Sequence, residues 1–283
     1  MVKIFSDSTC DLSPELIQKY GITIIPLYVR LGNEEYKDGV NIHPEDLFKW
    51  SDAHGDTPKT AAPGVKDVED LLDRSSEDEY VIFTISSSMS ASYNSCRLAA
   101  EALGMDERVF VIDSQNLSTG IGLQVLKAAE MAAQGKSGAE IKKEIEALRS
   151  KVRASFVIDT LIYLYRGGRC SGMAAIIGSA LKLHPRISVD GGAMHPEKKY
   201  RGKSDRFVMD YVKDMEEDLK KARCERVFIT HSGCDPKIVE EVRAYLESLH
   251  HFTEILETRA GSVISSHCGP GTLGVLFIAG EEN

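Results

Sequence analysis

Short apolar runs alternate with amphipathic segments along the first half of the chain. The apolar runs predict buried strands, at 2–5, 22–29, 80–85 and 108–113. The amphipathic segments predict helices, beginning at Ser13-Pro14-Glu15 and at Tyr93 and covering 122–134 and 139–152. Alternation of this kind predicts a parallel sheet with helices on both faces. Residues 30–60 interrupt the pattern as a polar, irregular segment with one short helix at 44–50.

The second half of the chain has a more mixed pattern. A glycine-hinged basic turn is expected at 163–171, a small apolar helix at 173–183 and a hairpin around Gly191-Gly192. Further helices are expected at about 205–222 and after Asp235-Pro236, with strands at 226–230, 253–258 and 275–279. The fold class is therefore α/β with two domains. We expect an N-terminal domain over 1–152 and a C-terminal domain with a mixed sheet over 153–283.

Composition narrows the classes of function. The chain has 283 residues, 42% hydrophobic and 27% charged, with a formal charge of −9. This negative charge argues against nucleic-acid binding, which needs a basic surface. The six cysteines show no metal-ligand spacing and predict free thiols in a reducing compartment. The first residues enter a strand directly, and no apolar run approaches the roughly 20 residues of a membrane span. We therefore expect a cytoplasmic protein.

A cluster of serines is the first candidate site. The segment Ile85–Tyr93, ISSSMSASY, follows a predicted strand and leads into a predicted helix. Free amide groups and the positive end of the helix dipole favour an anion there, and serine hydroxyls add uncharged donors. The alternative is a serine-rich turn and helix cap, for which serine is equally suited. The segment alone leaves both interpretations open.

Other motifs are weaker. Gly269–Gly274 matches G-x-G-x-x-G, but a strand rather than a helix follows it, so a dinucleotide site is rejected. Asp7 and Asp113 could bind a metal ion, although capping of turns is commoner, and no metal site is predicted. A Ser-His-Asp hydrolase stays open as a rival, although the chain has no G-x-S-x-G elbow.

Basic and histidine-containing turns supply further candidates. Arg166-Gly167-Gly168-Arg169 and Arg201-Gly202-Lys203 are either solvated turns or sites for a phosphate or an acidic partner. His267 stands directly before the Gly-Pro-Gly sequence at 269–271, where backbone can approach a ligand closely.

Taken in order, these segments resemble the DegV family, the lipid-binding proteins of bacterial fatty acid kinase. The matching pieces span nearly the whole chain: FSDSTCDL (5–12), IIPLYV (24–29), PKT (58–60), ISSSMSASY (85–93), VIDS (111–114), YLYRGGR (163–169), YRGK (200–203) and HCGPG (267–271). The resemblance implies a two-domain protein that holds one long-chain fatty acid between its domains. It also implies a partner kinase subunit that uses ATP to convert the bound acid into an acyl phosphate.

The resemblance also implies a set of site residues. The fatty acid carboxylate would be held by Thr60, Ser90 and His267, with Ser88 and Ser92 as additional candidate contacts. A protonated His267 would add a charge-assisted hydrogen bond. No cofactor is expected besides the bound fatty acid. The helix expected at 173–183 is a candidate for the tunnel wall, against the alternative of ordinary core packing. Four cations are candidate contacts for the kinase or for a membrane surface: Arg166, Arg169, Arg201 and Lys203.

Two short stretches depart from the family pattern. Thr60-Ala61-Ala62-Pro63 stands where the family usually has Thr-Ser-Gln-Pro, and Ser90-Ala91-Ser92 where it usually has Ser-Gly-Thr. The proposed carboxylate donors are kept, while Ala91 adds a methyl group beside them. The leading hypothesis is a non-catalytic fatty-acid-binding subunit. The alternative is an enzyme that acts on a small phosphorylated or carboxylated metabolite with His267 as base or nucleophile.

Overall fold

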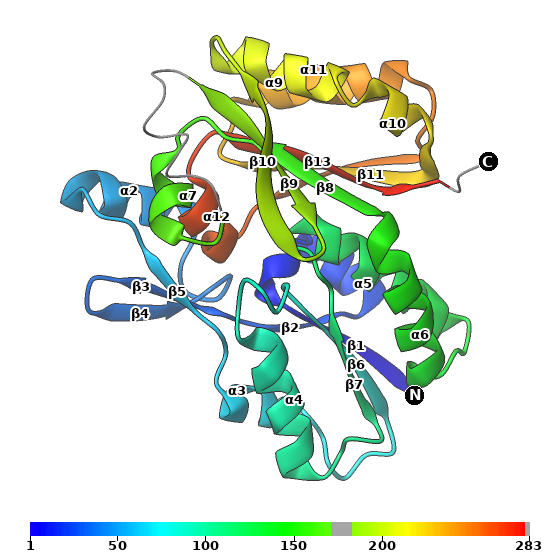
Figure 1. Cartoon of the computed structure of the whole chain (residues 1–283). Coiled ribbons are helices and arrows are strands. Elements are labelled where there is room, and N and C mark those ends of the chain that lie inside the picture. The colour runs from blue at the N-terminus through cyan, green and yellow to red at the C-terminus, as the bar shows by residue number, and fades with distance from the viewer. Residues whose placement is uncertain (171–182, 281–283) are drawn as a thin grey trace.

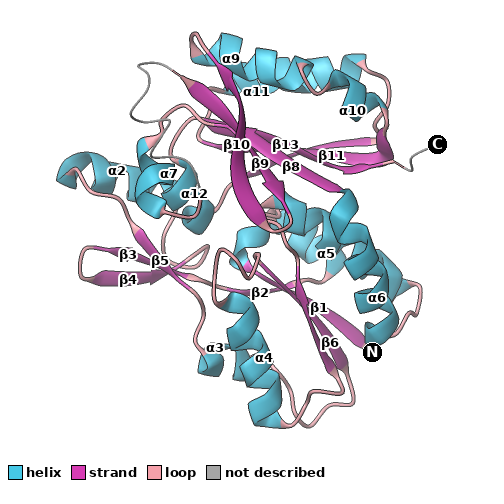
Figure 2. Ribbon diagram, viewed as in Figure 1, coloured by secondary structure: helices cyan, strands magenta, loops and turns pink. Residues whose placement is uncertain are grey.

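The computed structural model describes residues 1–170 and 183–280. Two main sheets lie one above the other, with a small third sheet beside them (Figure 1, Figure 2). The apolar helix expected at 173–183 lies outside the described residues except for its last position. Within the described residues, no helix is both long and apolar enough to cross a bilayer.

The N-terminal sheet has four strands in the order β2-β1-β6-β7, and every pairing is parallel. The strands are β1 (Val2–Asp7), β2 (Thr23–Ile25), β6 (Glu79–Thr84) and β7 (Val109–Asp113). The predicted parallel sheet is therefore confirmed. Pro26 ends β2 and separates it from β3 (Tyr28–Leu31), as expected for a residue that cannot donate to a strand ladder.

Both faces of this sheet are buried because side chains alternate along each strand. Ile4 and Phe83 belong to the apolar core on one face, and Phe5 and Ile82 to that on the other. The first core also packs against α1 (Pro14–Tyr20), α5 (Thr119–Ala133) and α6 (Gly138–Leu148). The second includes residues of α3 (Val65–Glu69) and α4 (Ser92–Leu103).

Residues 30–60 are not irregular, which corrects the expectation from the sequence. They contain most of a three-stranded antiparallel sheet, in the order β4-β3-β5, and an eleven-residue helix. The elements are β4 (Glu34–Lys37), α2 (Pro44–His54) and β5 (Lys59–Ala61). These strands are short, and β4 exposes two glutamates, so they lack the apolar runs that identify buried strands.

The C-terminal sheet has six strands in the order β10-β9-β8-β13-β11-β12. Only β11 and β12 pair in parallel, which confirms a mixed sheet. The strands are β8 (Val152–Val157), β9 (His184–Asp190), β10 (Ala193–Tyr200), β11 (Ala222–Ser232), β12 (Glu254–Arg259) and β13 (Thr272–Ala279). Gly191 and Gly192 form the predicted hairpin turn, with φ of +54° and +82°.

The helices of the second half differ from expectation in three places. The region expected to be one helix at 205–222 forms α9 (Ser204–Lys213) and α10 (Glu216–Lys220). The basic turn expected at 163–171 begins inside a helix, α7 (Ile162–Gly167). A further helix, α12 (Ser262–Cys268), was not expected and carries His267. The helix predicted after Asp235-Pro236 is present as α11 (Pro236–Ser248).

Helix α5 lies between the two main sheets (Figure 1). It is buried along almost its whole length. Ile121 and Leu126 share one apolar core with Phe83 of the N-terminal sheet and with Phe156 and Leu276 of the C-terminal sheet. Helices α9, α10 and α11 cover the other face of the C-terminal sheet in a separate core. The two sheets are thus held together by a common apolar layer.

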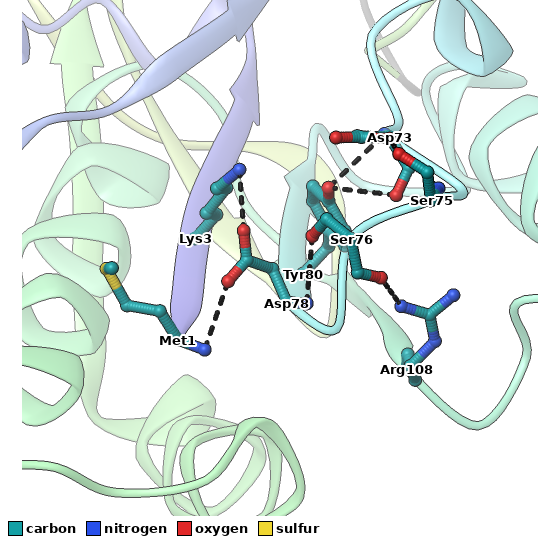
Figure 3. Close-up of polar contacts among 8 residues, drawn as sticks. All are labelled: Met1, Lys3, Asp73, Ser75, Ser76, Asp78, Tyr80 and Arg108. Atoms are coloured by element: carbon teal, nitrogen blue, oxygen red, sulfur yellow. Dashed lines mark hydrogen bonds and ion pairs between the residues drawn. The ribbon is translucent and has the colours of Figure 1, made fainter.

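An ionic cluster fastens the beginning of β1 to the turn before β6 (Figure 3). Asp78 accepts from the terminal amine of Met1 at 3.1 Å and from Lys3 at 2.7 Å. These contacts, the lysine foremost, lower the pKa of Asp78. The cluster lies at the end of the sheet where the strands begin, whereas ligands of parallel sheets bind beyond the carboxyl ends.

Candidate functional site

The serine segment forms a tight turn at the carboxyl end of β6. Ile85 donates its amide to Asp7 Oδ2 at 2.8 Å, and the amides of Met89 and Ser90 both donate to the Ser86 carbonyl. Helix α4 then begins at Ser92. The turn therefore occupies the expected end of the sheet and presents its hydroxyls there.

A hydrogen bond joins two of the predicted residues across 207 positions of the chain. Thr60 lies in β5, opposite Val29, and its Oγ1 is 2.8 Å from Nε2 of His267. His267 lies in the last turn of α12. The small sheet and the unexpected helix thus bring together residues that no local pattern links.

Thr60, Ser90 and His267 line a single cavity of about 750 Å³, counting its open mouth. The rest of its wall is mostly apolar and comes from both halves of the chain: Leu27, Ala61, Ala62, Ile85, Met89, Ala91, Leu117, Arg169, Met194, Val263, Ile264 and Cys268. We call it the apolar cavity. The three alanines that depart from the DegV pattern are among its lining residues.

A second cavity, the inner cavity, adjoins the first. It measures about 330 Å³ counting space open to solvent, is narrow inside with about 20 Å³ of free space, and shares Leu117, Ile264 and Cys268 with the apolar cavity. Phe156 and Leu276 of the C-terminal sheet also line it. The hydroxyl of Thr230, another wall residue, is bonded to Thr119 at 2.6 Å and to Thr258 at 3.0 Å. The Thr230 hydroxyl is therefore already hydrogen-bonded within the protein.

A third cavity, the basic cavity, also borders Thr60 and His267. It measures about 890 Å³ counting space open to solvent, and shares Thr60, Arg169 and His267 with the apolar cavity. Its remaining lining residues include Asp56, Lys59 and Arg166. Three cations and one carboxylate therefore line it, and the Thr60–His267 pair borders both this polar space and the apolar cavity.

His267 is neutral at ordinary pH. Burial, followed by the nearby charge of Arg169, lowers its pKa from 6.5 to about 4. This contradicts the expectation of a protonated ring. Nδ1 is buried without a hydrogen-bond partner among the described residues. The backbone of Gly167 fills the space beside it, since a Cβ there would lie only 2.4 Å from Nδ1. Gly167 thus serves close packing rather than a hinge.

The remaining predicted serines, Ser88 and Ser92, hydrogen-bond to protein groups. Ser88 and Ser86 both donate to the carbonyl of Gly192 in the β9–β10 turn, Ser86 at 2.7 Å. Ser88 does not line the apolar cavity. Ser92 is buried, and its hydroxyl is 2.9 Å from that of Ser90. Ser92 can orient Ser90, while Ser88 joins the two halves of the chain.

The predicted cations separate into two groups. Arg169 lines both the apolar and the basic cavity and donates to the Gly167 carbonyl at 2.7 Å. Arg166 lines the basic cavity and donates to Gly55 at 3.2 Å. Arg201 and Lys203 are exposed in the connection between β10 and α9 and line neither cavity. Only the first pair can therefore act near the Thr60–His267 pair.

Residues that could support metal or nucleophilic chemistry are engaged elsewhere. Asp7 accepts from Thr9 and Ile85, and Asp113 from Gln115 at 2.9 Å, so both carboxylates cap turns. Across residues 1–170 and 183–280, no group of three His, Cys, Asp or Glu could hold a metal ion. His267 has no carboxylate on Nδ1 within the same ranges, and so lacks the orienting acid of a catalytic triad.

Sequence reasoning missed several residues of the site. Leu27, Met89, Leu117 and Met194 line the apolar cavity but carry no motif, because apolar side chains are equally common in ordinary cores. Lys59 of the basic cavity stands beside Thr60 in the PKT motif, which was the available signal.

Comparisons with known proteins agree with this architecture. The model of the DegV family, described as "Uncharacterised protein, DegV family", matches residues 1–280. A DegV domain-containing protein of Caldanaerobacter subterraneus is 34% identical over 280 residues, which cover 98% of each chain.

Solved structures extend the similarity to three dimensions. A structure described as fatty acid binding of a DegV family protein from Thermus thermophilus has 30% identity and a TM-score of 0.90. It covers 98% of this chain and 99% of its own. The Streptococcus pneumoniae Fatty Acid Kinase (Fak) B3 protein, loaded with linoleic acid, shares the fold with 20% identity, a TM-score of 0.84 and 99% coverage of both chains. The chain belongs to the DegV family.

Proposed function

We propose that the protein binds one long-chain fatty acid in the apolar cavity and holds its carboxylate with Thr60, Ser90 and His267. The observation that carries this proposal is that all three polar groups line one cavity whose remaining wall, Arg169 apart, is apolar. The Thermus thermophilus relative, a fatty acid binder by its description, supports the ligand class. The head group would therefore meet donors while the tail meets a mostly apolar wall.

The tautomer of His267 explains how neutral groups can hold an anion. A buried N–H at Nδ1 would be left without an acceptor, so the proton belongs on Nε2. Nε2–H then donates to Thr60 Oγ1, and the Thr60 hydroxyl is free to donate to the carboxylate. Ser90 supplies a second donor. These bonds offset the several kcal/mol that an unpaired buried carboxylate would cost.

The tail supplies the affinity in this proposal. Burying about 14 methylenes at roughly 0.8 kcal/mol each contributes about 11 kcal/mol, of which association and ordering take back a large part. The tail would run past Leu117, Ile264 and Cys268 into the inner cavity, whose walls would move apart to admit it. Since wall residues come from both halves of the chain, we propose that the ligand lies between domains 1–152 and 153–283.

We further propose a partner kinase subunit that converts the bound acid into an acyl phosphate. The Streptococcus pneumoniae neighbour carries the name of a fatty acid kinase protein. The basic cavity beside Thr60 and His267 would give a phosphoryl donor access to the carboxylate. Arg166, Arg169, Arg201 and Lys203 remain candidate contacts for that kinase or for a membrane surface. In this proposal the protein is cytoplasmic, needs no cofactor and performs no chemistry alone.

The enzyme alternative would use His267 as base or nucleophile on a small metabolite. A depressed pKa keeps the ring unprotonated, which is the one observation in its favour. The missing acid on Nδ1 within the described residues and the apolar wall weigh against it. The fatty-acid-binding proposal is therefore preferred.

Organic extraction followed by mass spectrometry tests the proposed function. The purified protein should yield about one long-chain fatty acid per chain, and the delipidated protein should rebind added palmitic acid. Turnover of a small acid by the protein alone, without lipid in the extract, would establish the enzyme instead. Ser90→Ala should release palmitic acid about tenfold more readily, in line with the loss of one charge-assisted hydrogen bond. Ser88→Ala, in the same turn but outside the cavity, is the matched control.

A further inference from the structure

We propose that Asp11 and Asp38 are positioning residues of the lipid site: they fix α12, and with it His267, in the wall of the apolar cavity. Neither residue lines any of the three cavities. Their effect on fatty acid binding rests on the proposed function. Their role in positioning α12 and His267 does not depend on it. Both come from the N-terminal half, while α12 belongs to the C-terminal half.

The two carboxylates accept consecutive amides at the beginning of α12. Gly261 donates to Asp11 Oδ1 at 2.8 Å, and Ser262 donates to Asp38 Oδ1 at 2.7 Å. Both acids are almost fully buried, at 5% and 2% exposure. Helix α12 has no side-chain cap at Gly261, so these acids satisfy amides that would otherwise be unpaired.

Glycine at 261 allows this double contact. A Cβ built there would lie 3.2 Å from Oδ1 of Asp11 and 3.2 Å from Oδ1 of Asp38. The carboxylates of Asp11 and Asp38 therefore both lie close to the backbone of Gly261. Burial raises the pKa of both acids, and their mutual repulsion adds to the effect on Asp11. Apolar side chains in place of these acids would avoid the free-energy cost of burying carboxylates. They could not, however, accept hydrogen bonds from the two amides.

The second oxygen of each carboxylate holds another part of the cavity wall. Asp38 Oδ2 accepts from Ser8 at 2.8 Å, and the Ser8 oxygen accepts the Leu27 amide at 3.1 Å. Asp11 Oδ2 accepts from Ser118 at 2.5 Å, directly after Leu117. Leu27 and Leu117 both line the apolar cavity. Each acid thus ties α12 to one further wall segment.

This arrangement matters because α12 is only seven residues long. A helix this short depends on tertiary contacts for its place and its stability. It contributes Val263, Ile264, His267 and Cys268 to the apolar cavity. Loss of its anchored end would let His267 move from Thr60 and let water reach the ring.

The experiment compares Asp11→Ala and Asp38→Ala with the matching Asn variants, which keep an acceptor oxygen. Palmitic acid affinity and the His267 ring pKa, followed by NMR in delipidated protein, are measured for each. The Ala variants should bind at least about tenfold more weakly, and their ring pKa should move up toward 6.5. The Asn variants should stay within about threefold of the parent. Val242→Ala, on the buried face of α11, controls for general loss of stability.

Unchanged affinity and an unchanged ring pKa in the Ala variants would overturn the proposal. So would an equal loss of affinity in Val242→Ala at equal loss of stability. If the Ala variants do not fold, Ser8→Ala tests the Asp38 link alone, with Ser13→Ala, which removes the cap of α1, as control. Ser8→Ala should weaken binding and Ser13→Ala should not; equal behaviour would refute the link. Failure of the proposed function gives a different result. The parent protein would then not bind palmitic acid, while the pKa of His267 would still change in the Ala variants.

Discussion

The hydroxyl of Thr60 is hydrogen-bonded to His267 and, in our proposal, also donates to the carboxylate of the fatty acid. Thr60→Val keeps the shape of the side chain and removes both hydrogen bonds. Loss of a bond to a charged group predicts palmitic acid affinity about tenfold lower by calorimetric titration. Thr57→Val, at the basic cavity and away from the apolar one, should bind like the parent. Equal affinity for all three proteins would remove Thr60 from the site.

The low pKa of His267 predicts a pH-dependent stability. Its folded-state pKa of about 4 lies below the unfolded value of 6.5, so the folded protein binds fewer protons between these values. The stability from this ring is therefore complete above pH 6.5 and is lost as pH falls through 4. Between about pH 7 and pH 5 the loss is roughly 2 kcal/mol at most.

Urea denaturation of the parent and His267→Gln at both pH values isolates this effect. Burial raises the pKa of Asp7 to about 6, which acts in the opposite direction in both proteins and cancels in the comparison. The parent should lose more stability than the variant on acidification. Equal losses would mean that the ring is not held neutral by burial.

At the scale of single elements, the end of α7 packs closely against the end of α12. Gly167→Ala would bring a methyl group within 2.4 Å of His267 Nδ1 and push the ring from Thr60. Gly168→Ala adds strain at φ +66° but meets no atom within 4 Å. We expect the first variant to lose palmitic acid and to shift the His267 ring resonances, and the second to keep both. Identical behaviour would point to backbone strain instead.

Elements differ in how far the sequence could predict them. The strands of the N-terminal sheet, such as β6, are apolar runs and were predicted because they are buried on both faces. Strand β4 is short and exposed, and α12 is a seven-residue segment rich in serine, so neither has a distinctive period. Their structure depends on contacts with distant segments, among them the carboxylates at the start of α12.

The site itself could be predicted only in part. Thr60, Ser90 and His267 were named through the family resemblance, and they line one cavity. The neutral state of His267 could not be predicted, because it depends on burial and on Arg169. The basic cavity arises where β5 meets α7 and α12, and no stretch of sequence contains it.

At the scale of the molecule, the two adjoining cavities predict selectivity for chain length. Ala260 lines the inner cavity but not the apolar one. Ala260→Leu would fill part of the inner space, so long acids should lose affinity while a short acid such as decanoic acid keeps it. Competition between stearic and decanoic acid measures the ratio. A ratio equal to that of the parent would mean that the tail does not enter the inner cavity.

Helix α5 has a consequence for dissection of the chain. Both main sheets bury apolar side chains against it, so a fragment cut near residue 152 would expose α5 on one piece and the bare face of a sheet on the other. We expect either fragment to aggregate or to bind the other fragment. We therefore expect that neither half, transplanted alone into an unrelated protein, would fold as a free-standing module.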